Sequence, residues 1–86
     1  MVTPESIRTS IAEALRCEHV EVRGDGQHWE AVIVCAAFEG LSRVRRHQLV
    51  YGALGDRMRE EIHALSMTTL TPAQWAAAPG GRAGAE

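Results

Sequence analysis

FEGLSRVRRHQLVYGAL, at residues 38–54, is the stretch that decides the fold. Its glycine at position 40 interrupts the preceding apolar run, and Ser42 then stands where a helix N-cap belongs, with a hydroxyl able to accept a backbone N–H. Apolar residues recur on one side of the helix that would follow: Val44, Tyr51, Leu54 and Met58. We therefore predict a helix that starts after Ser42 and packs this side against the rest of the chain.

The first turn of this helix is basic. The residues concerned are Arg43, Arg45, Arg46 and His47. Because the helix macrodipole favours acidic side chains at this end, such a cluster needs an explanation. A surface that contacts nucleic acid or a protein partner is one explanation. For His47, a hydrogen-bonded structural role is the alternative.

Upstream of this helix, the pattern predicts one helix and two strands. Thr3 is a cap followed by proline, so we predict a helix over residues 4–16. Residues 19–23 alternate between polar and apolar, as in a half-buried strand. Residues 24–27 contain two glycines able to take positive φ and predict a tight turn. Residues 28–36 then form a nearly continuous apolar strand of the kind that other elements cover.

Downstream, residues 59–61 are a polar break, and residues 62–70 are predicted to form a third strand. Thr71 with its following proline starts a short closing helix, and we expect Trp75 to pack against the edge of the sheet. The fold class predicted is therefore α+β, with helices on one side of a three-stranded mixed sheet.

This topology would place two histidines, His28 and His63, close together. The first two strands must be antiparallel, because a tight turn joins them, whereas a helix of crossover length allows the second and third to be parallel neighbours. His28 and His63 would then start adjacent strands at the same end of the sheet, about 4.8 Å apart in backbone spacing. They are a candidate metal pair, although a closed zinc site needs four ligands and a partner would have to supply the rest.

Composition narrows the functional classes. The 86 residues are 45% hydrophobic with a net charge of −2, which argues against a general nucleic-acid binder.

We expect one domain over residues 1–78 and a disordered Gly/Ala tail over residues 79–86. Neither a targeting signal nor a membrane-length apolar run is visible, so we expect a cytoplasmic protein with Cys17 and Cys35 reduced. No catalytic motif stands out, so we predict that the chain is not an enzyme.

At this point the motifs closely resemble those of the BolA family. The resemblance is carried by residues 38–51, by Ile62-His-Ala-Leu65 and by Thr71-Pro-Ala-Gln-Trp75, in the same order as in the family. The short turn at residues 24–28 is similar to that of the IbaG-like, short-loop subgroup. The resemblance implies a class II KH-like fold, with the order helix, strand, strand, helix, strand.

The resemblance also implies a partner and a cofactor. BolA-like proteins pair with monothiol glutaredoxins, and a [2Fe-2S] cluster is then held by the glutaredoxin cysteine, a glutathione thiol and ligands from the BolA-like chain. The family's C-terminal histidine ligand matches His63, and its second ligand would fall on His28. Imidazole in place of thiolate raises the cluster's potential, which suits transfer or sensing of iron–sulfur clusters.

The resemblance implies an alternative function as well. Some family members are DNA-binding transcriptional regulators of stress genes, in which case the basic stretch at residues 43–46 would be the contact surface. Its arginines could reach phosphates, and affinity would then fall steeply with salt. Without a partner, the chain is expected to be a monomer or a weak homodimer.

Overall fold

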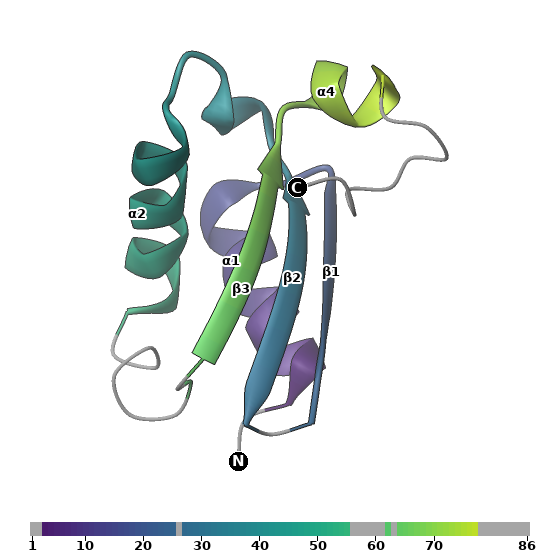
Figure 1. Ribbon diagram of the computed structural model, residues 1–86, viewed down its shortest axis with the longest axis vertical. Coiled ribbons are helices and arrows are strands. Elements are labelled where there is room, and N and C mark those ends of the chain that lie inside the picture. The colour runs from purple at the N-terminus through teal and green to yellow at the C-terminus, as the bar shows by residue number, and fades with distance from the viewer. Residues whose placement is uncertain (1–2, 26, 56–61, 63, 78–86) are drawn as a thin grey trace.

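The computed structural model describes residues 3–25, 27–55, 62 and 64–77. Three helices, one 3₁₀ helix and three strands are defined in these residues (Figure 1). In chain order they are α1 (Pro4–Leu15), β1 (His19–Gly24), β2 (His28–Val34), η1 (Ala36–Phe38), α2 (Arg43–Leu54), β3 (Ala64–Leu70) and α4 (Pro72–Ala77). The predicted α+β class and the predicted order of elements are confirmed.

The sheet has the order β1-β2-β3. β1 and β2 are antiparallel, with His19 opposite Val34, and β2 and β3 are parallel, with His28 opposite Ala64. Both orientations agree with the prediction. α1 packs on β1, and α2 packs on α1 and β3. Figure 1 shows α1 behind the sheet and α2 beside β3, so these two helices cover one face.

The first two helices begin at the caps that the sequence predicts. Thr3 and Ser6 form a capping box, in which the Thr3 hydroxyl accepts the Ser6 N–H at 3.1 Å and the Ser6 hydroxyl accepts the Thr3 N–H at 3.0 Å. The Ser42 hydroxyl accepts the Arg45 N–H at 3.2 Å. Each cap satisfies a backbone donor that the first helical turn leaves unpaired.

α4 begins in the same way and then reaches back to the sheet. The Thr71 hydroxyl accepts the Gln74 N–H at 3.1 Å, and the Gln74 side chain accepts the Thr71 N–H at 2.9 Å. The Trp75 ring stacks on His19, with 4.7 Å between ring centroids. The His19 Nε2 atom also lies 3.2 Å from a carboxylate oxygen of Glu21, without hydrogen-bond geometry. The predicted packing of Trp75 at the sheet edge is confirmed, and His19 is half-buried beneath it.

One apolar core fills the space between the sheet and the two long helices. Its largest fully buried side chains come from α1, β2, the residue after β2, η1, α2 and the residue that precedes His63 in the chain. They are Ile7, Ile11, Ile33, Cys35, Phe38, Val50 and Ile62. Their burial provides the main favourable term for folding.

The predicted packing side of α2 is confirmed at Leu54 and wrong at Val44 and Tyr51. Val44 is 64% exposed and Tyr51 is 41% exposed, whereas Val50 and Leu54 are buried; Met58 lies outside the described residues. The spacing of apolar residues gives the wrong side because Arg46, a charged residue, occupies the inward side one turn before Val50. Arg46 makes its hydrogen bonds within the protein. The inward side of α2 is therefore rotated away from Val44 and Tyr51 and carries Arg46, Val50 and Leu54.

The predicted ends of the second and third strands also need correction. β2 ends at Val34, because the chain then folds into η1, in which the Phe38 N–H donates to the Cys35 carbonyl at 3.1 Å. Cys35 still pairs with the neighbouring strand, since its N–H donates to the Leu70 carbonyl at 3.0 Å. β3 begins at Ala64, and Ile62 is buried ahead of it. The predictions for residues 59–61 and 79–86 fall outside the described residues.

Gly24, at the end of β1, is a position that needs glycine, but not because of its φ angle. The glycines with positive φ in the described residues are Gly40 and Gly55. A Cβ atom at position 24 would lie 2.6 Å from the ring of Trp29 and would also collide with the carbonyl of His28. The close approach of the indole ring and the β2 backbone therefore leaves no room for a side chain.

Candidate functional site

His28 opens β2, and the turn before it fixes its backbone. One oxygen of the Asp25 carboxylate accepts the N–H groups of Gln27 and His28, each at 2.9 Å, and the Asp25 N–H donates to the His28 carbonyl at 3.2 Å. An aspartate that accepts from the next backbone amides is an Asx turn. The His28 side chain is exposed. Its backbone is thus held in place while its imidazole remains accessible.

Asp25 is a functional candidate that the sequence did not single out. The glycines of residues 24–27 predict the turn, yet the Asp25 carboxylate is what positions the start of β2. The spacing Asp-x-x-His is the signal that could have found it, because an Asx turn reaches the amides two and three residues ahead. Asp25 is therefore a positioning residue for His28.

The Asp25 turn predicts a pH dependence of stability. The backbone N–H of His28, and then that of Gln27, lower the pKa of the Asp25 carboxyl. Because the folded-state pKa lies below the unfolded one, the stabilisation is complete above about pH 4 and is lost as the pH falls through the folded-state pKa. The thermal midpoints of wild type and Asp25→Ala should differ by a constant amount from pH 5 to 7 and converge in more acidic buffer. A difference that persists unchanged at pH 2 would contradict this role.

His28 lies beside the start of β3. The parallel register places it opposite Ala64, the residue that follows His63 in the chain. Neighbouring strands in a sheet are about 4.8 Å apart. His63 itself lies outside the described residues, so the expected convergence of the two histidines stays a prediction.

The sheet surface around His28 is open to a partner. A shallow hollow of about 450 Å³ is lined by Arg23, Gly24, Asp25, His28 and Glu30. Arg23 and Glu30 face each other across β1 and β2 at 3.5 Å, with both side chains mostly exposed, so their ion pair contributes little to stability. Both signs of charge and one imidazole thus lie together at this end of the sheet.

The basic residues of α2 do not form one surface. Arg43 and Arg45 are exposed, whereas Arg46 is half-buried. The Arg46 guanidinium donates to the Leu41 carbonyl at 3.1 Å and to the Thr69 carbonyl at 3.0 Å. Arg46 therefore connects the start of α2 to the end of β3.

Two further contacts complete the environment of Arg46. Its Nη1 atom also donates to the Gln74 side chain at 3.0 Å, and its guanidinium lies 5.8 Å from the centre of the Phe38 ring.

His47 is half-buried, and its Nε2 atom has no hydrogen-bond partner among the described residues. Of the four predicted contact residues, Arg43 and Arg45 are thus the exposed ones.

The exposed side of α2 combines apolar and basic character. Val44 and Tyr51 lie two turns apart and are among the large hydrophobic side chains left exposed in the described residues. Arg45 lies next to Val44. Val44, Arg45 and Tyr51 are called the α2 outer surface below. Arginine and tyrosine are residues that protein interfaces favour.

The two cysteines lie together but are not reactive thiols. The Cys35 thiol is buried and donates to the Leu15 carbonyl at 3.2 Å. Burial, and then a hydrogen bond to Cys35 and its charge, raise the pKa of Cys17 to about 12. Both cysteines are free thiols. The thiolate is the reactive form, so Cys17 is not poised for nucleophilic chemistry, and the Cys35 thiol is closed off from solvent.

The raised pKa of Cys17 gives a direct prediction. At pH 8, iodoacetamide should alkylate Cys17 in the folded chain at least about 100-fold more slowly than free cysteine, because so little thiolate forms at a pKa of about 12. Mass spectrometry of timed samples measures the rate, and the urea-unfolded chain is the control. Alkylation of the folded chain at the rate of the unfolded chain would contradict the burial described.

The described part of the chain offers neither a cluster of metal-ligand side chains nor a membrane-spanning helix. Residues 3–25, 27–55, 62 and 64–77 contain no group of three or more histidine, cysteine or acidic side chains able to hold a metal ion. None of the helices within these residues has the length and apolar character needed to span a bilayer.

Comparison with known proteins defines the class of protein. Residues 3–74 match the family model described as BolA-like protein. The fold agrees, since the structure of a BolA-like protein from Babesia bovis superposes with a TM-score of 0.80 at 31% identity, over 90% of this chain and 93% of that one. The chain belongs to the BolA family.

Particular relatives show where in the family the similarity lies. The acid stress protein IbaG of Escherichia coli (strain K12) is 41% identical over 71 residues, covering 81% of this chain and 84% of the relative. A BolA homologue from Coxiella burnetii of known structure is 44% identical with a TM-score of 0.75, over 88% of this chain and 99% of that one. The DNA-binding transcriptional regulator BolA of Haemophilus influenzae is 39% identical over 59 residues, 69% of this chain and 57% of the relative.

Proposed function

We propose that this protein is a non-enzymatic partner of a monothiol glutaredoxin and that it shares a [2Fe-2S] cluster with it. His28 and His63 are the ligands from this chain, and the glutaredoxin cysteine and a glutathione thiol are the others. Membership of the BolA family supports the proposal. The observation that carries it is the parallel register of β2 and β3, which sets exposed His28 beside Ala64, the residue next to His63 in the chain.

The residues around His28 fit a shared cluster. An iron ligand must present an accessible nitrogen atom, and the His28 side chain is exposed at the open end of the sheet. Its backbone is fixed by Asp25, so little backbone freedom is lost when the imidazole binds. Histidine ligation would give the cluster a higher potential than four thiolates do.

The α2 outer surface is the proposed contact for the glutaredoxin. Val44 and Tyr51 offer apolar area that this chain leaves uncovered, and Arg45 offers a charge for an acidic group of the partner. Such a combination suits a transient interface, in which a few anchors provide most of the binding energy. Arg46 is excluded from this role because its guanidinium is bonded within the protein.

The proposal is tested by assembling the complex. The chain is mixed anaerobically with a monothiol glutaredoxin, glutathione, iron and sulfide, and visible absorption and circular dichroism are recorded. Wild type should give a heterodimer spectrum that differs from that of the glutaredoxin homodimer. His28→Ala and His63→Ala should each change that spectrum or lose the cluster. The matched control is His19→Ala, which removes a histidine from the opposite end of the β1–β2 pair.

Two results would count against this function. The first is a cluster spectrum that His28→Ala and His63→Ala both leave identical to wild type, which would remove the ligand assignment. The second is the absence of any heterodimer in size-exclusion chromatography or isothermal titration calorimetry. In that case the partnership itself is wrong.

A second candidate function is DNA binding by the exposed arginines of α2. Arg43 and Arg45 lie exposed in the first turn of the helix, and the 39%-identical Haemophilus influenzae relative is a DNA-binding transcriptional regulator. Affinity for duplex DNA should then fall steeply with salt, and Arg45→Ala should weaken binding and reduce the salt slope. Arg23→Ala, an exposed arginine on β1, is the control. If fluorescence anisotropy detects no salt-dependent binding, this candidate is removed.

A further inference from the structure

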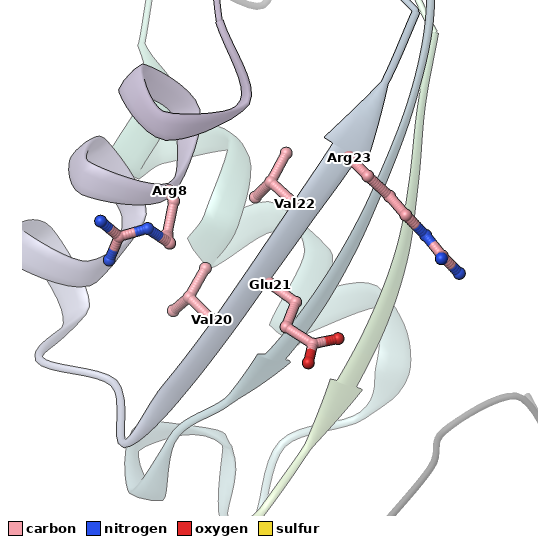
Figure 2. Close-up of a pocket in the computed structure, with 5 residues that line it drawn as sticks. All are labelled: Arg8, Val20, Glu21, Val22 and Arg23. Carbon is pink, nitrogen blue, oxygen red and sulfur yellow. The ribbon is translucent and has the colours of Figure 1, made fainter.

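β1 is an edge strand with an open side. The sheet order makes β2 its neighbour on one side, and no described element lies beyond it on the other (Figure 1). Figure 2 shows Val20 and Val22 directed toward α1 and Arg8, with Glu21 and Arg23 on the opposite face of the strand. A hollow of about 480 Å³ runs along this edge. An open edge is a template for pairing with another strand.

The backbone groups that face this open side can be identified. The Asp25 N–H donates to the His28 carbonyl across β1 and β2, and these residues belong to the same register as Arg23 and Glu30. In an antiparallel ladder the bonded residues alternate. Positions 19, 21 and 23 therefore bond to β2, and the backbone N–H and C=O groups of Val20, Val22 and Gly24 point outward.

We propose that β1 pairs with β1 of a second copy of this chain, antiparallel, with Val22 opposite Val22 of that copy. The two sheets would join into one six-stranded sheet. Outward groups at positions 20, 22 and 24 then meet their counterparts at positions 24, 22 and 20, which makes about six backbone hydrogen bonds. The pairing requires neither a cluster nor a glutaredoxin.

Charge selects this register. With Val22 at the centre, Glu21 lies opposite Arg23 of the second copy, and Arg23 lies opposite Glu21. These are non-hydrogen-bonded pairs, in which side chains approach most closely and opposite charges attract. Glu21 is 57% exposed and Arg23 is 86% exposed, so both side chains are available on the open face. The same register sets Asp25 opposite His19.

The neighbouring registers are excluded by like charges. Moving the centre by one residue in one direction places Glu21 opposite Glu21, and moving it the other way places Arg23 opposite Arg23. Like charges directly opposite each other destabilise a strand pair. A strand with Glu and Arg two positions apart is therefore complementary to itself at one alignment. Because one strand pair is a small interface, we expect a weak dimer.

Sedimentation equilibrium of the full chain tests this inference. The concentrations run from about 10 µM to 1 mM, because small interfaces dissociate in this range. Wild type should show a reversible monomer–dimer equilibrium. Glu21→Arg and Arg23→Glu should each raise the dimer dissociation constant at least about tenfold, because each turns two attractive pairs into repulsive ones. The charge-matched controls are Glu39→Arg, beyond η1, and Arg45→Glu, on α2. Each should leave the dimer dissociation constant within about twofold of the wild-type value. Far-UV circular dichroism confirms that each variant is folded.

Mixing the two β1 variants gives the decisive result. Glu21→Arg pairs with Arg23→Glu through two opposite-charge pairs, so an equimolar mixture should dimerise although each variant alone does not. The double variant Glu21→Arg/Arg23→Glu should dimerise like wild type. The inference is overturned if wild type stays monomeric at 1 mM, or if the mixture stays monomeric. It is also overturned if Arg45→Glu, and not Arg23→Glu, abolishes dimers, since the interface would then lie on α2.

Discussion

Arg46→Ala is expected to lower the free energy of unfolding by about 3 kcal/mol, one of the largest effects of any single change on α2. The substitution removes the bonds to the Leu41 and Thr69 carbonyls and to the Gln74 side chain. It also removes the guanidinium from beside the Phe38 ring. Hydrogen bonds to a charged donor contribute more than neutral ones, and partly buried acceptors left unpaired add a further cost. Urea denaturation followed by tryptophan fluorescence measures the effect.

Two variants separate the geometry of Arg46 from its charge. Arg46→Lys keeps the charge but offers a single ammonium group in place of a planar fork, so it should recover less than half of the lost stability. Arg45→Ala removes an exposed neighbour and should change the free energy of unfolding by less than about 0.5 kcal/mol. Equal effects of Arg45→Ala and Arg46→Ala would contradict the structural role of Arg46.

Gly24→Ala is expected to destabilise the fold by about 2 kcal/mol and to move the turn that carries His28. The new methyl group would lie 2.6 Å from the Trp29 ring and would also strike the His28 carbonyl. The ring is 2% exposed and packed in the core, and the carbonyl belongs to the β2 backbone, so neither can move aside cheaply. Urea denaturation reports the stability, and the amide chemical shift of His28 reports the turn.

Gly52 provides the matched control for this prediction. It lies inside α2, and a Cβ atom there would meet nothing within 4 Å. Gly52→Ala should therefore raise the free energy of unfolding by roughly 0.5–1 kcal/mol, because alanine loses less backbone freedom on folding than glycine. If Gly24→Ala is as stabilising as Gly52→Ala, the contact between the turn and Trp29 is not as described.

Much of the fold can be predicted from the sequence, because local signals decide it. Thr3, Ser42 and Thr71 each cap a helix through a hydrogen bond to a backbone amide three residues ahead, and this pattern is visible in the chain. The antiparallel pairing of the first two strands follows from the short turn between them. The parallel pairing of β2 and β3 follows from a helix of crossover length.

The side of α2 that packs inward could not be predicted in the same way. A count of apolar residues places Val44 and Tyr51 inside, but their side chains are exposed. The inward position is filled by Arg46, whose partners Leu41, Thr69 and Gln74 come from three other segments of the chain. Only tertiary structure brings these acceptors together, so no pattern within the helix reveals them.

The candidate site, too, could be predicted from the sequence only in part. His28 stands at the end of the sheet that the sequence predicts, opposite Ala64, because strand order and direction fix that position. The role of Asp25 in holding His28 depends on the geometry of one turn and was missed. The exposed apolar residues of α2 were also missed as a surface, because they had been assigned to the core.

The central claim is that histidines of this chain bind iron in a cluster shared with a glutaredoxin. The most direct measurement is pulsed electron–nuclear double resonance on the reduced heterodimer, with ¹⁵N-histidine incorporated only into this chain. The account predicts strong ¹⁵N couplings that weaken or disappear in His28→Ala and His63→Ala and persist in His19→Ala. A reduced cluster in the heterodimer that shows no ¹⁵N coupling from the labelled chain would contradict it.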